Sequence, residues 1–123
     1  MPRYAVLLYW PEAATPGYGT PEFQKMANAY SSFTAEIGKA GIMKSSEGLQ
    51  PTSTATTVRV REGKTLTTDG PFAETREQLG GVWLFECQDL DEAISWAAKI
   101  PQAQNGSVEI RPLWQQSTKS GNQ

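Results

Sequence analysis

Two stretches of this chain are apolar at both alternating sets of positions, a pattern typical of strands covered on both faces of a sheet. They are residues 4–10 (YAVLLYW) and residues 80–87 (GGVWLFEC). Residues 107–114 instead alternate apolar and polar positions, which predicts a strand covered on one face, and Pro112 favours a sheet edge or a strand end. We therefore expect the first two strands to be central in their sheet.

Two further segments repeat apolar residues at helical spacing. The first follows Thr20 and Pro21, an N-cap residue and a first-turn proline, and stops before Gly41, a natural terminator. The second follows the N-cap residue Asp89, and Pro101 lies just past its end; residues 102–106 then read as a loop. The apolar stripes are Phe23, Met26, Ala27, Tyr30, Phe33, Thr34 and Ile37 in the first helix, and Leu90, Ala93, Ile94, Ala97 and Ala98 in the second.

The middle of the chain predicts a weaker strand at residues 42–50, a break at residues 51–53, and a β-hairpin at residues 54–68. A three-residue loop, residues 61–63, with Gly63 left-handed would place Val58 opposite Leu66 and Val60 opposite Lys64. In that register Val58 and Leu66 share a buried face, and the hairpin ends at Asp69.

The order of elements is strand, helix, strand with hairpin, strand, helix, strand. It predicts an α+β fold of the ferredoxin-like split β-α-β type with an inserted β-hairpin, in which two helices cover one face of an antiparallel sheet. We expect one domain at residues 1–114 and a polar C-terminal tail at residues 115–123. The second apolar face needs a cover, so we expect a homodimer with facing sheets; a ligand-binding groove is the rival explanation, and a dimer can form both.

Charge and composition disfavour several classes of function and location. The 11 basic and 13 acidic residues give a net charge of −2, and the basic residues are scattered apart from Arg59, Arg61 and Lys64, which disfavours nucleic-acid binding. The longest apolar run, residues 5–10, is too short to cross a bilayer, and the N-terminus lacks a cleavable apolar leader. A single cysteine, Cys87, fits a reducing compartment. We expect a soluble, cytoplasmic protein.

The chain has no histidine, which removes the commonest general base and the commonest metal ligand. With one cysteine it also lacks a multi-cysteine zinc site, so we expect no metal. Sequences typical of phosphate-binding loops or of a serine nucleophile elbow are absent, and we expect no cofactor. Catalysis would have to use carboxylates, Tyr, Lys or Arg.

The densest candidate chemistry lies in residues 69–81. Asp69 precedes Gly70 and Pro71, so it is either a carboxylate fixed at a strand end for acid/base work or a turn residue that caps backbone N–H groups. Glu74, with Arg59, is a candidate for binding a polar ligand, against the alternative of solvated ion pairs.

Aromatic side chains offer a second set of candidates. Tyr9 and Trp10 could line a pocket with Phe72, against the alternative of core packing. Gly80 and Gly81 allow a close approach or form a bulge or left-handed turn.

Residues 69–81 (DGPFAETREQLGG) resemble the signature of the YCII-related, DGPF-domain family. Residues 47–51 (EGLQP), 56–59 (TTVR), 89–93 (DLDEA) and 106–112 (GSVEIRP), together with Pro101, are also similar to that family, so the resemblance covers residues 2–113. It implies a ferredoxin-like fold in the dimeric α/β-barrel superfamily and a homodimer. For related YCII-type proteins it implies enzymatic activity through an Asp–His pair; this chain has no histidine, and Asp69 is the counterpart of the aspartate.

Two functions follow as hypotheses. In the first, the protein is a homodimeric small-molecule-binding domain, with possible lyase, isomerase or hydrolase-like chemistry at Asp69 and with Arg59 holding an anionic group on a small polar or anionic ligand. In the second, it is a non-catalytic regulatory or interaction protein linked to an extracytoplasmic-function sigma factor, because some members of the family are encoded beside such factors. The sequence leaves open whether the protein is an enzyme.

Overall fold

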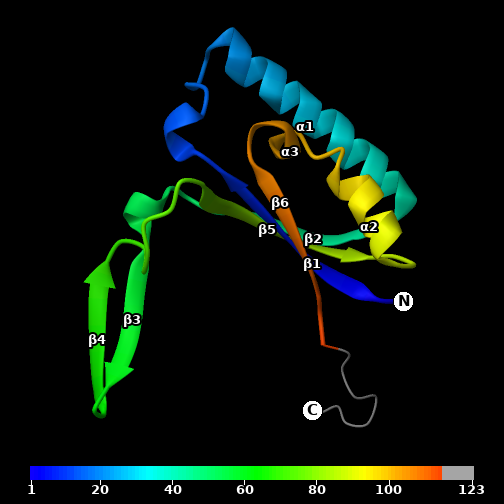
Figure 1. Cartoon of the computed structure of the whole chain (residues 1–123). Helices are drawn as coiled ribbons and strands as arrows, with labels where there is room; N and C mark the ends of the chain where they lie inside the picture. Colours follow the sequence, from blue (N-terminus) through cyan, green and yellow to red (C-terminus); the bar gives the residue numbers. More distant parts are fainter. Residues whose placement is uncertain (115–123) are drawn as a thin grey trace.

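The computed structural model describes residues 1–114, in which a four-stranded antiparallel sheet carries helices on one face (Figure 1). The strand order is β2-β5-β1-β6, with β1 at Arg3–Trp10, β2 at Met43–Gly48, β5 at Gln78–Glu86 and β6 at Ser107–Pro112. The helices are α1 (Pro21–Ala40), α2 (Leu90–Ala97) and α3 (Gln102–Asn105). An α+β fold with antiparallel sheets is therefore confirmed, and β1 and β5 are central as the sequence predicts. The tail expected at residues 115–123 lies outside the described residues.

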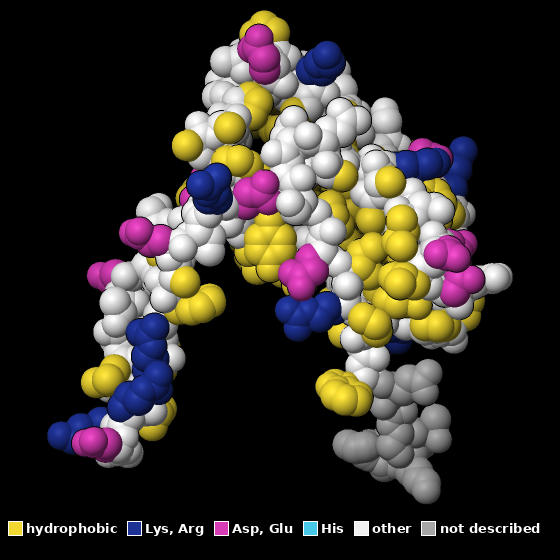
Figure 2. All heavy atoms as spheres, viewed as in Figure 1, with side chains coloured by type: hydrophobic (Ala, Val, Ile, Leu, Met, Phe, Trp, Pro, Cys, Tyr) yellow, Lys and Arg dark blue, Asp and Glu magenta, His cyan; other side chains and the backbone are white. Residues whose placement is uncertain are grey.

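A β-hairpin stands apart from this sheet as a separate two-stranded unit, made by β3 (Thr56–Arg61) and β4 (Lys64–Asp69). It extends away from α1, on the opposite side of the four-stranded sheet (Figure 1). Figure 2 shows basic and apolar side chains exposed along it. Val58 and Val60 are 60% and 59% exposed, and Leu66 is 48% exposed.

The expected register of this hairpin is wrong. Glu62 and Gly63 both have positive φ, 52° and 75°, so they form a two-residue turn in place of the expected three-residue loop. Arg59 then lies opposite Leu66, and Val58 lies opposite Thr67. Because a one-residue shift moves every side chain to the other face, Val58 and Leu66 lie on opposite faces of the hairpin and share no buried surface.

Helix α1 begins and ends at the capping residues that the sequence predicts, and helix α2 begins at its predicted N-cap residue. Thr20 Oγ1 accepts a hydrogen bond from the backbone N–H of Phe23 at 3.1 Å, and Gly41 closes α1 in the left-handed region at φ 71°. Asp89 caps α2 in the same way. The loop expected at residues 102–106 is wrong, since Pro101 has helical φ and ψ and leads into the one-turn helix α3.

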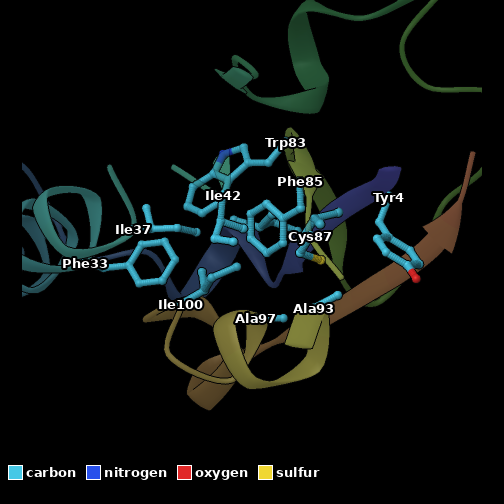
Figure 3. Close-up of a cluster of buried hydrophobic side chains, with 12 residues drawn as sticks. Tyr4, Phe33, Ile37, Ile42, Trp83, Phe85, Cys87, Ala93, Ala97 and Ile100 are labelled. Atoms are coloured by element: carbon cyan, nitrogen blue, oxygen red, sulfur yellow. The ribbon is translucent and has the colours of Figure 1, made fainter. Parts of the chain in front are cut away.

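The core lies between the sheet and the helices (Figure 3). Alternate residues of β1 and β5 point into it, and the aromatic rings of Phe33 on α1 and Trp83 on β5 stack at 5.6 Å between centroids. Leu90 and Ile94, expected in the apolar stripe of α2, are about half exposed, whereas Ala93 and Ala97 are buried. The small buried residues let α2 lie close to the sheet. The core residues are Tyr4, Val6, Leu8, Phe33, Ile37, Ile42, Trp83, Phe85, Cys87, Ala93, Ala97 and Ile100.

The other face of the sheet carries no helix within residues 1–114. Its centre is apolar, with Leu7 and Tyr9 of β1 half-buried beside Leu84 of β5, and Val82 is 36% exposed. We call Ala5, Leu7, Tyr9, Val82 and Leu84 the bare face. In the same described range, none of the helices is long and apolar enough to cross a membrane.

Gly80 forms a β-bulge between the two central strands. Leu8 pairs with Gly81 and Tyr9 pairs with Leu79, so Gly80 has no partner on β1. A Cβ atom on Gly80 would lie 2.3 Å from Cη2 of Trp10, because the indole ring occupies that space. A bulge was one of the roles that the sequence allowed for Gly80 and Gly81, and this bulge is confirmed. It leaves room for the side chain of Trp10.

Candidate functional site

Where the hairpin joins the four-stranded sheet, the chain surrounds an open cleft of about 520 Å³. Its walls come from the 3₁₀ turn at Thr52–Thr54, the end of β4, and the segment leading into β5. We call it the Asp69 cleft. The polar side chains that line it are Thr52, Ser53, Asp69, Glu74, Thr75 and Gln78.

Gly70 sets the position of Asp69. It has φ 98°, a conformation that an L side chain rarely adopts, and it turns the chain sharply out of β4. Its N–H donates to the carbonyl oxygen of Ala55 at 2.7 Å, and its own carbonyl accepts from Oγ1 of Thr57 at 2.8 Å. The backbone directly after Asp69 is therefore held to the start of β3 from both sides.

The Asp69 side chain itself is exposed and opposite Thr56 in the hairpin. Within residues 1–114 its carboxylate takes part in none of the side-chain hydrogen bonds or ion pairs that hold the surrounding turn. The turn is held by Ala55 and Thr57 and not by a capping aspartate. The carboxylate is left free to accept hydrogen bonds from a ligand.

A network centred on Glu12 fixes the far wall of the cleft. The Glu12 carboxylate accepts from the N–H of Thr52 at 2.9 Å and from its Oγ1 at 2.8 Å. The backbone N–H of Glu12 donates to Oε1 of Gln78 at 2.8 Å, and Nε2 of Gln78 donates to the carbonyl of Thr75 at 2.6 Å. Sequence patterns do not reveal Glu12, Thr52 and Gln78 as partners, because Thr52 lies 40 residues and Gln78 lies 66 residues from Glu12 along the chain.

Of the expected site residues, Asp69 and Glu74 both line the Asp69 cleft. Arg59 does not line the cleft: it pairs with Leu66, three positions along the hairpin, and faces the side opposite Asp69. Phe72 is 79% exposed and does not line it either.

Tyr9 lies on the bare face, on the four-stranded sheet, and also does not line the cleft. Burial raises the pKa of its phenol, and the negative charge of the neighbouring Glu109 carboxylate raises it further. The expected pocket of Tyr9, Trp10 and Phe72 is therefore not formed by these three residues together.

The lining of the Asp69 cleft offers acceptors and hydroxyl groups but no cationic side chain. Residues 1–114 contain no group of three or more carboxylate or thiol side chains placed to hold a metal ion. The chemistry available there is hydrogen bonding to two carboxylates, three hydroxyls and one amide.

These features define an α+β domain with a free carboxylate at a cleft beside an outlying hairpin. Comparison with known families places the chain: it belongs to the YCII-related domain family, whose model matches residues 3–117. The family resemblance of the sequence is thereby confirmed. The chain is similar to an uncharacterized protein of Rhizobium meliloti (strain 1021), with 39% identity over 112 residues that span 89% of this chain and 90% of the relative.

Proposed function

We propose that this protein is a homodimeric small-molecule-binding domain whose ligand binds in the Asp69 cleft. The observation that carries the proposal is a carboxylate, Asp69, with no partner of its own among the described side chains, held at the mouth of a 520 Å³ opening by a left-handed glycine. The backbone next to this carboxylate is held by the hydrogen bonds that join Gly70 to Ala55 and Thr57, so a ligand can bind with little rearrangement of the backbone.

The charge of the lining indicates the class of ligand. Asp69 and Glu74 are the charged side chains there, and Arg59, expected to hold an anionic group, faces the other side of the hairpin. Two carboxylates repel an anion and attract a cation. We therefore favour a polar, neutral or amine-bearing ligand over an anionic one.

An enzymatic role would use the same carboxylate. In a chain without histidine, Asp69 is the residue we propose to accept or donate a proton on a bound ligand, in lyase, isomerase or hydrolase-like chemistry. Glu74, on the same cleft, would orient the ligand. Binding is the primary proposal, and catalysis requires it.

We also propose how the strands and helices are arranged within the α+β fold and how two copies of the chain pack. The sheet order β2-β5-β1-β6, with α1 between β1 and β2 and α2 between β5 and β6, supports a ferredoxin-like split β-α-β arrangement with β3 and β4 inserted. The bare face supports a second copy packed sheet against sheet, as in a dimeric α/β barrel, because water otherwise covers its apolar centre.

The hairpin supports the dimer independently. It extends past the sheet on the side away from α1, where a facing copy would sit (Figure 1). Its Val58, Val60 and Leu66 are about half exposed or more, and Arg59, Arg61 and Lys64 form no ion pair within residues 1–114. An isolated two-stranded hairpin is marginally stable in water, so contact with a second copy would stabilise it.

The ligand proposal is tested with Asp69→Asn, which keeps the shape of the side chain and removes its charge. In a thermal-shift screen of polar and amine-bearing small molecules, we expect ligands that raise the Tm of the wild type to lose their effect on Asp69→Asn. Glu62→Gln is the matched control, because Glu62 is an exposed carboxylate at the hairpin tip and does not line the cleft. Ligands that stabilise Asp69→Asn as well as the wild type would overturn the proposal.

A non-catalytic interaction protein is the second candidate, including the link to an extracytoplasmic-function sigma factor. The exposed Phe72, beside the hairpin with its exposed valines, favours it. On this alternative, the screen would yield no ligand at the cleft for the wild type or for Asp69→Asn.

A further inference from the structure

The hairpin has two open edges, because β3 and β4 pair with each other and with no other strand in residues 1–114. In an antiparallel pair, successive residues of a strand alternate between bonding across the pair and pointing their N–H and C=O groups outward. The hydrogen bond from the N–H of Gly70 to the carbonyl of Ala55 sets this alternation, since it marks these two residues as a bonded pair. The outward residues are therefore Thr56, Val58 and Val60 on β3 and Thr65, Thr67 and Asp69 on β4.

The β3 edge is the more apolar of the two. Val58 and Val60 are 60% and 59% exposed and lie on the same face, whereas the outward residues of β4 are two threonines and an aspartate. Within residues 1–114, one side chain bonds an outward backbone group of β3: Nη1 of Arg61 donates to the carbonyl of Val60 at 3.1 Å. The hairpin stands clear of the four-stranded sheet (Figure 1). An exposed edge strand without proline or a bulge is a template for pairing with another strand.

A second copy of the chain fits this edge in one register. Two β3 strands related by a two-fold axis run antiparallel, and their backbones bond only where outward residues lie opposite one another. Placing Val58 opposite the partner's Val58 also sets Thr56 opposite the partner's Val60, so all three outward residues pair. A shift of one residue sets outward against inward groups, and a shift of two pairs fewer residues. Arg59 then lies opposite the partner's Thr57, so like charges do not meet directly.

The distribution of charge along the hairpin favours the same antiparallel pair. The tip carries Arg61 and Lys64 beside Glu62, so it is net positive. The base carries Asp69 and Glu74, which line the cleft. Because the two hairpins run in opposite directions, the basic tip of each lies beside the acidic base of the other. Such complementary charges favour this orientation over a parallel one.

We propose that β3 of one protomer pairs with β3 of its partner, so that the two hairpins form one four-stranded antiparallel sheet in the order β4-β3-β3-β4. The proposal rests on the proposed homodimer only in requiring a second copy. The combined sheet carries Val58 and Val60 of both copies on one face. Three or more strands with an apolar face are needed for an independently stable sheet, so the pair stabilises a hairpin that is marginal alone.

The pair also makes the Asp69 cleft a site bordered by two chains. In this register the partner's Arg61 lies opposite Ala55, which has extended φ and ψ and directly precedes β3. Ala55 follows the 3₁₀ turn Thr52–Thr54, whose first two residues line the cleft. The tip of the partner's hairpin therefore lies beside that wall of the cleft, where a single chain leaves it open.

Cysteine cross-linking tests the register. Val58→Cys places the new thiol opposite its copy, at a Cα separation of about 5.5 Å, which a disulfide accepts. Under air oxidation we expect most of this variant to run as a disulfide-linked dimer in non-reducing electrophoresis. Thr67→Cys is the matched control and should stay uncross-linked, because Thr67 is exposed directly opposite Val58 on the outer edge of the same hairpin. The native Cys87 is buried in the core and should not react.

Proline variants test the backbone bonds. Val58→Pro removes an outward N–H of β3 and Thr67→Pro removes one of β4, and neither N–H bonds within the hairpin. We expect Val58→Pro to raise the dimer dissociation constant about 10-fold or more, because one hydrogen bond is lost on each side of the two-fold axis. Thr67→Pro should leave it unchanged. Light scattering over a concentration series measures both.

The outcomes separate this proposal from that of the homodimer. Equal cross-linking of the two cysteine variants, or equal dissociation of the two proline variants, would overturn the β3 pair. A wild type that scatters as two chains while Val58→Cys gives no cross-link would overturn the pair and leave the homodimer standing. A wild type that scatters as one chain would overturn both.

Discussion

At the scale of single residues, the chemistry of the cleft depends on one backbone conformation. Gly70 is left-handed, and a Cβ atom there would meet no atom within 4 Å beyond its two neighbours in the chain, so a side chain would be opposed by backbone strain. Its two hydrogen bonds, to Ala55 and from Thr57, require the turn to keep that geometry. Any change at this position therefore reports on the turn and not on crowding.

Gly70→Ala should lower the free energy of unfolding by about 1–2 kcal/mol, the usual cost of a left-handed L residue. Urea unfolding followed by tryptophan fluorescence measures it. Gly48→Ala is the control, since Gly48 also has open space around its Cα but lacks a positive φ. Equal stability of the two variants would contradict the assigned role of Gly70.

Tyr30 predicts a loss of stability at alkaline pH. Burial raises the pKa of its phenol from 10.0 to about 12, with the neighbouring Gln102 amide opposing part of the shift. Above pH 10 the unfolded phenol ionises while the folded one keeps its proton, so stability contributed by Tyr30 is complete below pH 10 and is lost as the pH rises to about 12.

The loss should be on the order of 2 kcal/mol. Urea unfolding at pH 9 to 11.5 measures it, and the difference between wild type and Tyr30→Phe isolates this phenol from the lysines and other tyrosines that titrate nearby. If the free energy of unfolding of the two proteins changed with pH in parallel, the pKa of the Tyr30 phenol would not be raised by folding.

The sequence predicted part of this site at residue level. Asp69 and Glu74 line the same cleft because they are five residues apart in one turn-rich segment. Arg59 was misplaced because a single left-handed Glu62 shortens the hairpin turn and changes the register by one residue. Glu12 could not be found, since its importance depends on contacts with Thr52 and Gln78, far along the chain.

At the scale of elements, local signals decided what could be predicted. Capping residues in the sequence predict helices α1 and α2. Apolar residues on both faces predict that β1 and β5 are the central strands. The sequence does not predict helix α3, because a proline after an apolar helical stripe indicates the end of a helix, whereas proline also begins helices. The separation of the hairpin from the main sheet has no sequence signal, because its alternation of Thr and Val also fits a half-buried strand.

Glu12 joins three elements, and its removal should loosen them together. Glu12→Gln keeps the size of the side chain but replaces one charged acceptor oxygen by an amide nitrogen, which cannot accept from Thr52. We expect a loss of about 1–3 kcal/mol in the free energy of unfolding. Glu62→Gln, with no such bonds, should change it little.

Hydrogen exchange would locate the effect. The amide N–H of Thr52 should lose protection in Glu12→Gln, while the N–H groups of α1 should keep theirs. Unchanged protection at Thr52 would contradict the assigned network.

At the scale of the whole molecule, the main feature is the amount of apolar surface that the single chain leaves uncovered. Helices cover one face of the sheet, and the bare face and the hairpin are exposed on the other side (Figures 1 and 2). Large uncovered apolar regions are typical of interfaces. The proposed homodimer accounts for both regions with one partner.

Leu84→Asp should dissociate this dimer while leaving the monomer folded, because Leu84 lies on the bare face and outside the buried core. Light scattering at micromolar concentration should give the mass of two chains for the wild type and of one chain for the variant. Ile94→Asp, on the half-exposed side of α2, is the control and should stay dimeric. A wild type that scatters as a single chain would rule out the dimer.

The claim on which the functional account rests is that the Asp69 carboxylate binds a ligand. Crystals soaked with a panel of small amines and polar fragments test it most directly. We expect a fragment in the Asp69 cleft with a donor atom about 2.6–3.2 Å from a carboxylate oxygen of Asp69, and an empty cleft in Asp69→Asn crystals soaked in the same way. Fragments that bind elsewhere but never in this cleft, or that occupy it equally in both proteins, would contradict the account.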